Sequence, residues 1–295
     1  MKNNSMKTNN GNKIKAGALI AEIITAIIFL AFLFPFFIVF INSAKTAFEI
    51  TAYPMAMPEK WGNILANIAN IWTSENIRYR SSLFSSVLIT AIALFAINIL
   101  SSQAAWVLVR NKSKTSNAIF FIFVAAMVIP FQIVMFPLLS WFRMITKATG
   151  IPLLRTYGGI VLAYVGFGIS LSIFMFHGFI KSIPLELEEA ATIDGCKKYQ
   201  TFYEIIFPIL KPIHATVLVL NGIWIWNDYL LPLLILGKGN VIQTIPLAVS
   251  NFAGAYVKQW DLILTAILLA MIPVIVFFLF AQKYIVKGMV AGSIK

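Results

Sequence analysis

The sequence predicts an all-α fold: a polytopic membrane protein with six transmembrane helices. The chain of 295 residues is 60% hydrophobic and 12% charged, and its mean hydropathy of +0.86 lies outside the composition of soluble globular domains. Apolar segments of about 20 residues recur along it, which is the length that a hydrocarbon core of about 30 Å requires. No Lys or Arg stands inside any of these segments.

The expected spans, in order along the chain, cover residues 16–41, 83–109, 117–142, 158–180, 212–236 and 262–281. A basic leader precedes the first span, as in a signal peptide. That span has about 26 residues, however, whereas a signal h-region has roughly 7 to 15, so we interpret it as a retained anchor. Residues 1–15, rich in Asn and Lys, are expected to be a disordered tail, and residues 282–295 a second tail.

The positive charges predict the orientation. Fourteen of the 23 Lys and Arg fall on the side of the membrane that holds both termini, the turn 110–114 and the connection 181–211. Because short cytoplasmic loops are enriched in Lys and Arg, both termini are expected to be cytoplasmic. This distribution also explains the net charge of +12, so no nucleic-acid partner is expected.

The connection 181–211, between spans four and five, is the most informative segment. Pro184 suits the first turn of a helix, and three glutamates follow it where the helix dipole favours negative charge. Gly195 would end this helix after about eleven residues. A second short helix is predicted by the apolar spacing of Phe202, Ile205 and Ile206. An acidic segment would be repelled by an anionic lipid surface, so we expect it to dock into a protein groove.

This connection resembles the EAA motif of the permease subunits of bacterial ABC importers, and we call it the coupling loop. The coupling residues that the resemblance implies are Glu189, Ala190, Ala191, Asp194, Gly195, Ile205, Phe207 and Pro208. Phe207 replaces the usual leucine before the final proline. Segments 42–50, 127–137, 226–232, 244–249 and 282–295 are similar to the carbohydrate-uptake branch of these importers, in particular to the smaller permease of the maltose system.

The resemblance implies a set of partners in the bacterial plasma membrane. They are a second permease subunit, an ATPase dimer on which the coupling loop docks, an extracytoplasmic solute-binding protein and a sugar. ATP and Mg would bind to the ATPase, so no cofactor is expected on this chain. The residues agree, because the sequence contains no GxxxxGK motif followed by Ser or Thr and no catalytic constellation. Its single cysteine, Cys196, offers no thiolate set for a metal.

Candidate residues for the substrate path are Asn221, Trp224, Asn227 and Asp228 in span five. An ionisable group within a span is a functional candidate by default, and aromatic rings beside amides suit sugar recognition. The competing interpretation for Asp228 is structural: near the outer end of the span, its carboxylate could meet water or cap a broken helix.

Other functions stay open at this point. An ion-coupled secondary transporter could use Asp228 or Glu22 as the coupling site, but it leaves the coupling loop unexplained. An ABC importer for a polyol or glycerol phosphate is a second alternative, although the absence of basic residues from the spans disfavours an anionic solute. A membrane anchor for a cytoplasmic partner would not need six spans.

Overall fold

The computed structural model describes residues 5–73, 78–250 and 259–293, and these ranges contain helices and no strand. The elements are α1 (Ser5–Ser43), α2 (Ala47–Ala52), α3 (Asn63–Thr73), α4 (Tyr79–Arg110), α5 (Lys114–Ala126), α6 (Phe131–Thr149), α7 (Tyr157–Ile180), α8 (Glu186–Ile193), α9 (Lys198–Gln200), the π-helical turn η1 (Thr201–Ile206), α10 (Phe207–Ile209), α11 (Lys211–Asn227), α12 (Leu230–Ile235), α13 (Ile245–Val249) and α14 (Trp260–Ser293). The predicted all-α class is confirmed.

Four helices of the described residues are long and apolar enough to cross a membrane by themselves: α4, α7, residues 17–43 of α1 and residues 260–279 of α14. Two bent helix pairs can each supply a further span. The α5 and α6 axes differ by 108°, and the segment Lys198–Ile209 meets α11 at 74°. The described residues therefore supply four to six spans, and six when each bent pair is counted as one span. Lys198–Ile209 lies in the predicted connection 181–211, so only α11 of the second pair falls within the predicted fifth span.

The predicted span 117–142 is broken in the structure, because α5 ends at Ala126 and α6 begins after Pro130. Proline has no amide hydrogen and disfavours helical geometry at the residue before it, here Ile129. The predicted span 212–236 is broken as well, in line with the interpretation of Asp228 as the cap of a broken helix. Asp228 adopts an extended conformation with ψ of 129°, and this separates α11 from α12.

The two expected tails are helical over most of their length. Helix α1 begins at Ser5, so the predicted disorder of residues 1–15 does not hold from that residue onward. Extending an existing helix costs far less than nucleating one, so the apolar span can carry a polar segment with it. Helix α14 likewise continues through the expected tail 282–295 as far as Ser293, and residues 294–295 lie outside the described ranges.

The chain forms two compact units, of which the first comprises Met1–Thr73 and Phe252–Leu269. A buried polar cluster closes the end of α1 in this unit. The ammonium of Lys45, a residue that is 1% exposed, donates to Asn42 Oδ1 at 3.0 Å and to the Tyr53 carbonyl at 2.9 Å. The amide of Asn67 donates to the Ser43 carbonyl at 3.0 Å. These donors satisfy carbonyls that the end of a helix leaves unpaired.

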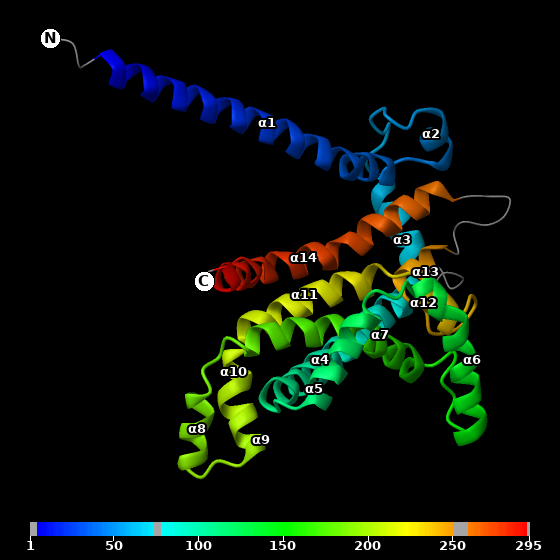
Figure 1. Ribbon diagram of the computed structural model, residues 1–295. Helices are drawn as coiled ribbons and strands as arrows, with labels where there is room; N and C mark the ends of the chain where they lie inside the picture. Colours follow the sequence, from blue (N-terminus) through cyan, green and yellow to red (C-terminus); the bar gives the residue numbers. More distant parts are fainter. Residues whose placement is uncertain (1–4, 74–77, 251–258, 294–295) are drawn as a thin grey trace. The chain divides into compact units, whose positions relative to one another are not determined.

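The second unit comprises Ser74–Asn251 and Ala270–Lys295, and α4 packed along α7 forms its centre. Helix α11 packs against both. A side chain on Gly168 would place its Cβ 2.6 Å from Ile97 Cδ1 and 2.8 Å from Asn221 Oδ1, so any larger residue would displace the ends of these two side chains where the three helices meet. Helices α8, α9 and α10 gather beyond one end of α7 and α11, whereas α12 follows the other end of α11 (Figure 1).

Candidate functional site

Helix α8 of the coupling loop is shorter than predicted, with eight residues, and it ends as the sequence indicates. Gly195 follows it in the left-handed region with a φ of +83°. The Gly195 amide donates to the Thr192 carbonyl at 3.1 Å, and the Cys196 amide donates to the Ala191 carbonyl at 2.9 Å. This is a Schellman C-cap, which satisfies two carbonyls of α8 and reverses the chain at a position that favours glycine.

The two faces of α8 differ in chemistry. Glu188 and Ala191, one turn apart, are buried against the rest of the unit. The predicted coupling residues Glu189, Ala190 and Asp194 lie on the exposed face. Ile193 stands beside them with 86% of its surface exposed. An exposed large apolar side chain among exposed acids gives this face the mixed character of a docking surface.

The inner face of α8 is held by the end of α4. The Arg110 guanidinium donates from Nε to Glu188 Oε1 at 2.6 Å and from Nη2 to the Ile183 carbonyl at 3.1 Å. The Trp106 indole donates to Glu188 Oε2 at 3.1 Å. Sequence reasoning missed this anchor, because Arg110 was counted only among the charges that set topology. No local pattern connects two residues 78 positions apart.

The second arm of the coupling loop contains α9, η1 and α10. Phe202 is buried, and its ring lies 5.2 Å from the Trp106 ring and 5.9 Å from the Phe207 ring, measured between centroids. Ile205 and Phe207 are half-buried, whereas Pro208 is exposed. Of the predicted coupling residues on this arm, Phe207 packs on the Phe202 ring, Ile205 is partly covered and Pro208 is exposed.

The candidate path residues separate into two groups. Asn221 and Trp224 both line a cavity of about 930 Å³ bounded mainly by α6, α7 and α11. The Asn221 amide donates to Ser172 Oγ at 3.0 Å, and the Trp224 ring packs edge-on against Tyr164 with centroids 5.4 Å apart. This volume lies within the usual range for small-molecule sites, and an indole face beside an amide suits a sugar ring.

Asn227 and Asp228 are not among the residues that line this cavity. The Asn227 side chain is exposed and donates to the Ile223 carbonyl at 2.8 Å. Asp228 Oδ1 accepts from the Leu230 amide at 3.0 Å, while its Oδ2 accepts from the Tyr164 hydroxyl at 3.1 Å. These bonds match the capping role that the sequence left open for Asp228.

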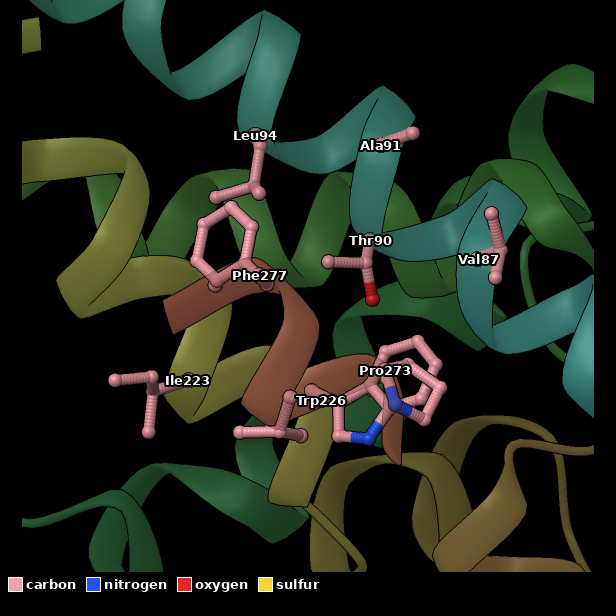
Figure 2. A pocket seen from close by; sticks show the side chains of 10 residues that line it. Val87, Thr90, Ala91, Leu94, Ile223, Trp226, Pro273 and Phe277 are labelled. Carbon is pink, nitrogen blue, oxygen red and sulfur yellow. The ribbon is translucent and has the colours of Figure 1, made fainter. Parts of the chain in front are cut away.

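A second, smaller pocket of about 230 Å³ lies between α4, α11 and α14 (Figure 2). Its lining is apolar apart from Thr90 and Trp226. The Trp226 indole already donates to the Ala270 carbonyl at 3.2 Å. A sugar hydroxyl would find few partners here, because burying an unpaired polar group is costly. This pocket suits a hydrocarbon group rather than a sugar.

Among the described residues, the remaining titratable groups form no metal site. The described residues contain no group of three or more His, Cys, Asp or Glu that could hold a metal ion. The His177 ring stacks on Phe120 with centroids 3.8 Å apart, and His214 packs against Phe176 and Phe207. Glu22 is exposed on α1.

Comparison with known proteins agrees with this geometry. Residues 97–291 match the family model described as binding-protein-dependent transport system inner membrane component. The chain is 38% identical over 261 residues, covering 88% of this chain and 91% of the relative, to the probable starch degradation products transport system permease protein AmyC of Thermoanaerobacterium thermosulfurigenes. It is 32% identical to the melibiose/raffinose/stachyose import permease protein MelC of Bacillus subtilis, with 94% and 96% of the two chains covered.

A solved structure shows the same fold. This chain superposes with a TM-score of 0.76, at 20% identity and over 92% of its length and 97% of the other chain, on a bacterial ABC transporter involved in the import of the acidic polysaccharide alginate. The family match covers the coupling loop, the cavity beside α11 and most of the spans. The chain is a multi-pass membrane protein and belongs to the family of binding-protein-dependent transport system inner membrane components.

Proposed function

We propose that this chain is the permease subunit of an ATP-driven importer for a sugar or oligosaccharide. The relatives named above are permeases of starch-product and melibiose, raffinose and stachyose systems, and the multiple sugar-binding transport system permease protein MsmG of Streptococcus mutans is 34% identical over 215 residues. The observation that carries the proposal is the division of α8 into an anchored face and an exposed face with Glu189, Ala190 and Ile193.

The exposed face of α8 docks on a separate ATPase dimer, which binds ATP and Mg; this chain itself catalyses no reaction. A second permease subunit completes the translocation path, and an extracytoplasmic solute-binding protein delivers the sugar. The chain lies in the bacterial plasma membrane with both termini in the cytoplasm. The excess of Lys and Arg on the side that holds the coupling loop supports this orientation.

Within the membrane, Asn221 and Trp224 line the solute path. The support is their place in the cavity of about 930 Å³, where the indole can cover a sugar ring. The Asn221 amide nitrogen already donates to Ser172 Oγ and to the Val217 carbonyl, so its Oδ1 is the atom left to accept from a sugar hydroxyl. Asp228 acts from outside the cavity by holding Tyr164 and the start of α12. Since Tyr164 packs on Trp224, the aspartate orients the aromatic wall of the path.

The test is solute uptake by the reconstituted transporter. The two permeases, the ATPase and the solute-binding protein are placed in vesicles, and uptake of labelled maltooligosaccharides and raffinose is followed with ATP present. We expect uptake to require ATP and to survive collapse of the ion gradients. Uptake that stops when the gradients are dissipated at constant ATP would favour an ion-coupled carrier instead.

The variant Glu189→Lys tests the docking role of α8 at a single residue. It is expected to abolish uptake and to loosen the ATPase, while the permease pair stays in the membrane. Glu186→Lys, also exposed in the first turn of α8, is the matched control for a change of charge on this helix. Unaltered transport and ATPase association in Glu189→Lys would refute the docking role.

A further inference from the structure

We propose that Arg110 is a positioning residue that sets the angle of α8 on α4 and so passes movements of the coupling loop into the membrane-spanning helices. The inference rests on the proposed function, since it concerns how the docked loop acts. It assigns a role to a contact between α4 and α8 that lies outside the predicted coupling residues.

Arg110 holds the coupling loop at two points. One lies at Glu188, inside α8, and the other at the Ile183 carbonyl, three residues before α8 begins at Glu186. A contact at one point would leave α8 free to pivot, whereas contacts on both sides of its entry restrict the direction of its axis. The planar guanidinium is suited to this, because its donors point in fixed directions.

Trp106 further restricts the contact between Arg110 and Glu188. It stands one turn before Arg110 on α4, and its indole occupies the carboxylate oxygen of Glu188 that Arg110 leaves free. The same part of α4 also contacts the second arm of the coupling loop. Phe202 packs on the Trp106 ring, and Gln103 hydrogen-bonds to the Tyr203 hydroxyl. The last two turns of α4 therefore hold both arms.

The charges distinguish this link from ordinary packing. Glu188 is 8% exposed, whereas the glutamates on either side of it, Glu186 and Glu189, are exposed. A buried ion pair is often no more stabilising than apolar residues of similar volume, so stability alone does not require it. Its directional bonds specify one geometry, and α4 is packed along α7 in a way that can carry a displacement into the bundle.

The experiment measures sugar molecules transported per ATP hydrolysed by the complete transporter in vesicles, together with the yield of assembled complex. Arg110→Met keeps the apolar stem and removes the donors. We expect it to lower the transport ratio by at least about fivefold, the lower end of an ordinary coupling free energy, while ATPase association is retained. Glu186→Gln is the matched control and should keep the wild-type ratio.

Two further variants keep the inference testable if Arg110→Met fails to assemble. Arg110→Lys retains the charge but cannot reach Glu188 and Ile183 with a rigid fork, so an intermediate ratio is expected. The exchange Arg110→Glu with Glu188→Arg should recover part of the ratio lost in Arg110→Glu alone. The inference would be overturned if assembled Arg110→Met or Arg110→Lys complexes kept the wild-type transport ratio. It would also be overturned if the transport ratio fell only in proportion to the yield of assembled complex. Failure of the proposed function is distinguishable, because the wild-type chain would then show no ATP-driven transport.

Discussion

The coupling loop and the break between α11 and α12 both interrupt a helical segment, and both use a carboxylate to hold the interruption. In the loop, Glu188 is paired with a cation, Arg110, from another helix. At the break, Asp228 is held by the Leu230 amide and by the Tyr164 hydroxyl, with no cation among its hydrogen-bond donors. The first arrangement ties two helices together, whereas the second mainly caps the next helix. We propose that the first connection moves during transport and that the second stays fixed.

The largest effect is expected at the turn that ends α8. Gly195 and Gly150 both follow helices, with φ of +83° and +74°, and a Cβ would meet no other atom at either position. Valine should therefore cost a similar amount of folding free energy at both, about 1–2 kcal/mol. If the coupling loop is the moving connection, uptake should fall by roughly 10- to 100-fold in Gly195→Val and little in Gly150→Val.

Uptake by the reconstituted transporter measures this difference, with complex yield recorded for each variant. Equal losses in the two variants would show that strain alone matters and would remove the distinction between the two regions.

The next effect concerns the fixed connection at Asp228. Asp228→Leu removes the cap of α12, worth about 1 kcal/mol, and leaves the Tyr164 hydroxyl without its acceptor, at about 1–3 kcal/mol. Asp228→Asn keeps an acceptor oxygen and should lose less than half as much. Thermal unfolding in detergent, followed by circular dichroism, measures both. An unchanged midpoint in Asp228→Leu would contradict the capping role.

A smaller effect, on the KM for sugar, should distinguish residues that line the cavity from residues near the break between α11 and α12. Trp224 lines the cavity, whereas Asn227 stands one turn later and does not. Trp224→Ala should raise the apparent KM for sugar uptake by about 3- to 10-fold, the equivalent of about 0.5–1.5 kcal/mol for an aromatic contact. Asn227→Ala should leave KM near that of the wild type. Equal KM values in the two variants would place the solute path elsewhere.

The smallest effect is a pH dependence of the local stability of α2. Here a carboxylate accepts a backbone hydrogen bond, as at Asp228, but it lies in contact with water. Glu49 accepts from the Thr46 amide at 2.7 Å, and this hydrogen bond holds the pKa of Glu49 below its ordinary value of 4.5. The stability that Glu49 contributes is therefore present above pH 4.5 and is lost as the pH falls through the lowered pKa.

Hydrogen exchange at the α2 amides measures this loss, after correction for the intrinsic rate. Protection should fall with acidification in the wild type and vary less in Glu49→Gln. Identical pH profiles in the two proteins would show that the backbone contact does not hold the carboxylate.

The sequence was sufficient for properties that depend on composition or local pattern. Span length predicted the helical class, and Gly195 predicted the end of α8, because each rests on local chemistry. Proline inside the predicted spans indicated kinks, and Asp228 was offered as the cap of a broken helix, but the size of each bend was not predicted. An apolar segment predicts burial in lipid, but it does not predict the angle at which the helix bends. Arg110 and Glu188 were missed for a different reason: the packing of distant helices brings them together.

The most direct test of the docking role is chemical protection of the exposed face of α8. Cys196→Ser removes the native thiol, and Ile193→Cys then places one at the position that is 86% exposed. A maleimide should label this thiol rapidly in the permease pair and slowly once the ATPase dimer is added, while Lys112→Cys, an exposed position on the turn before α5, stays reactive in both. Equal labelling of Ile193→Cys with and without the assembled ATPase would contradict the account.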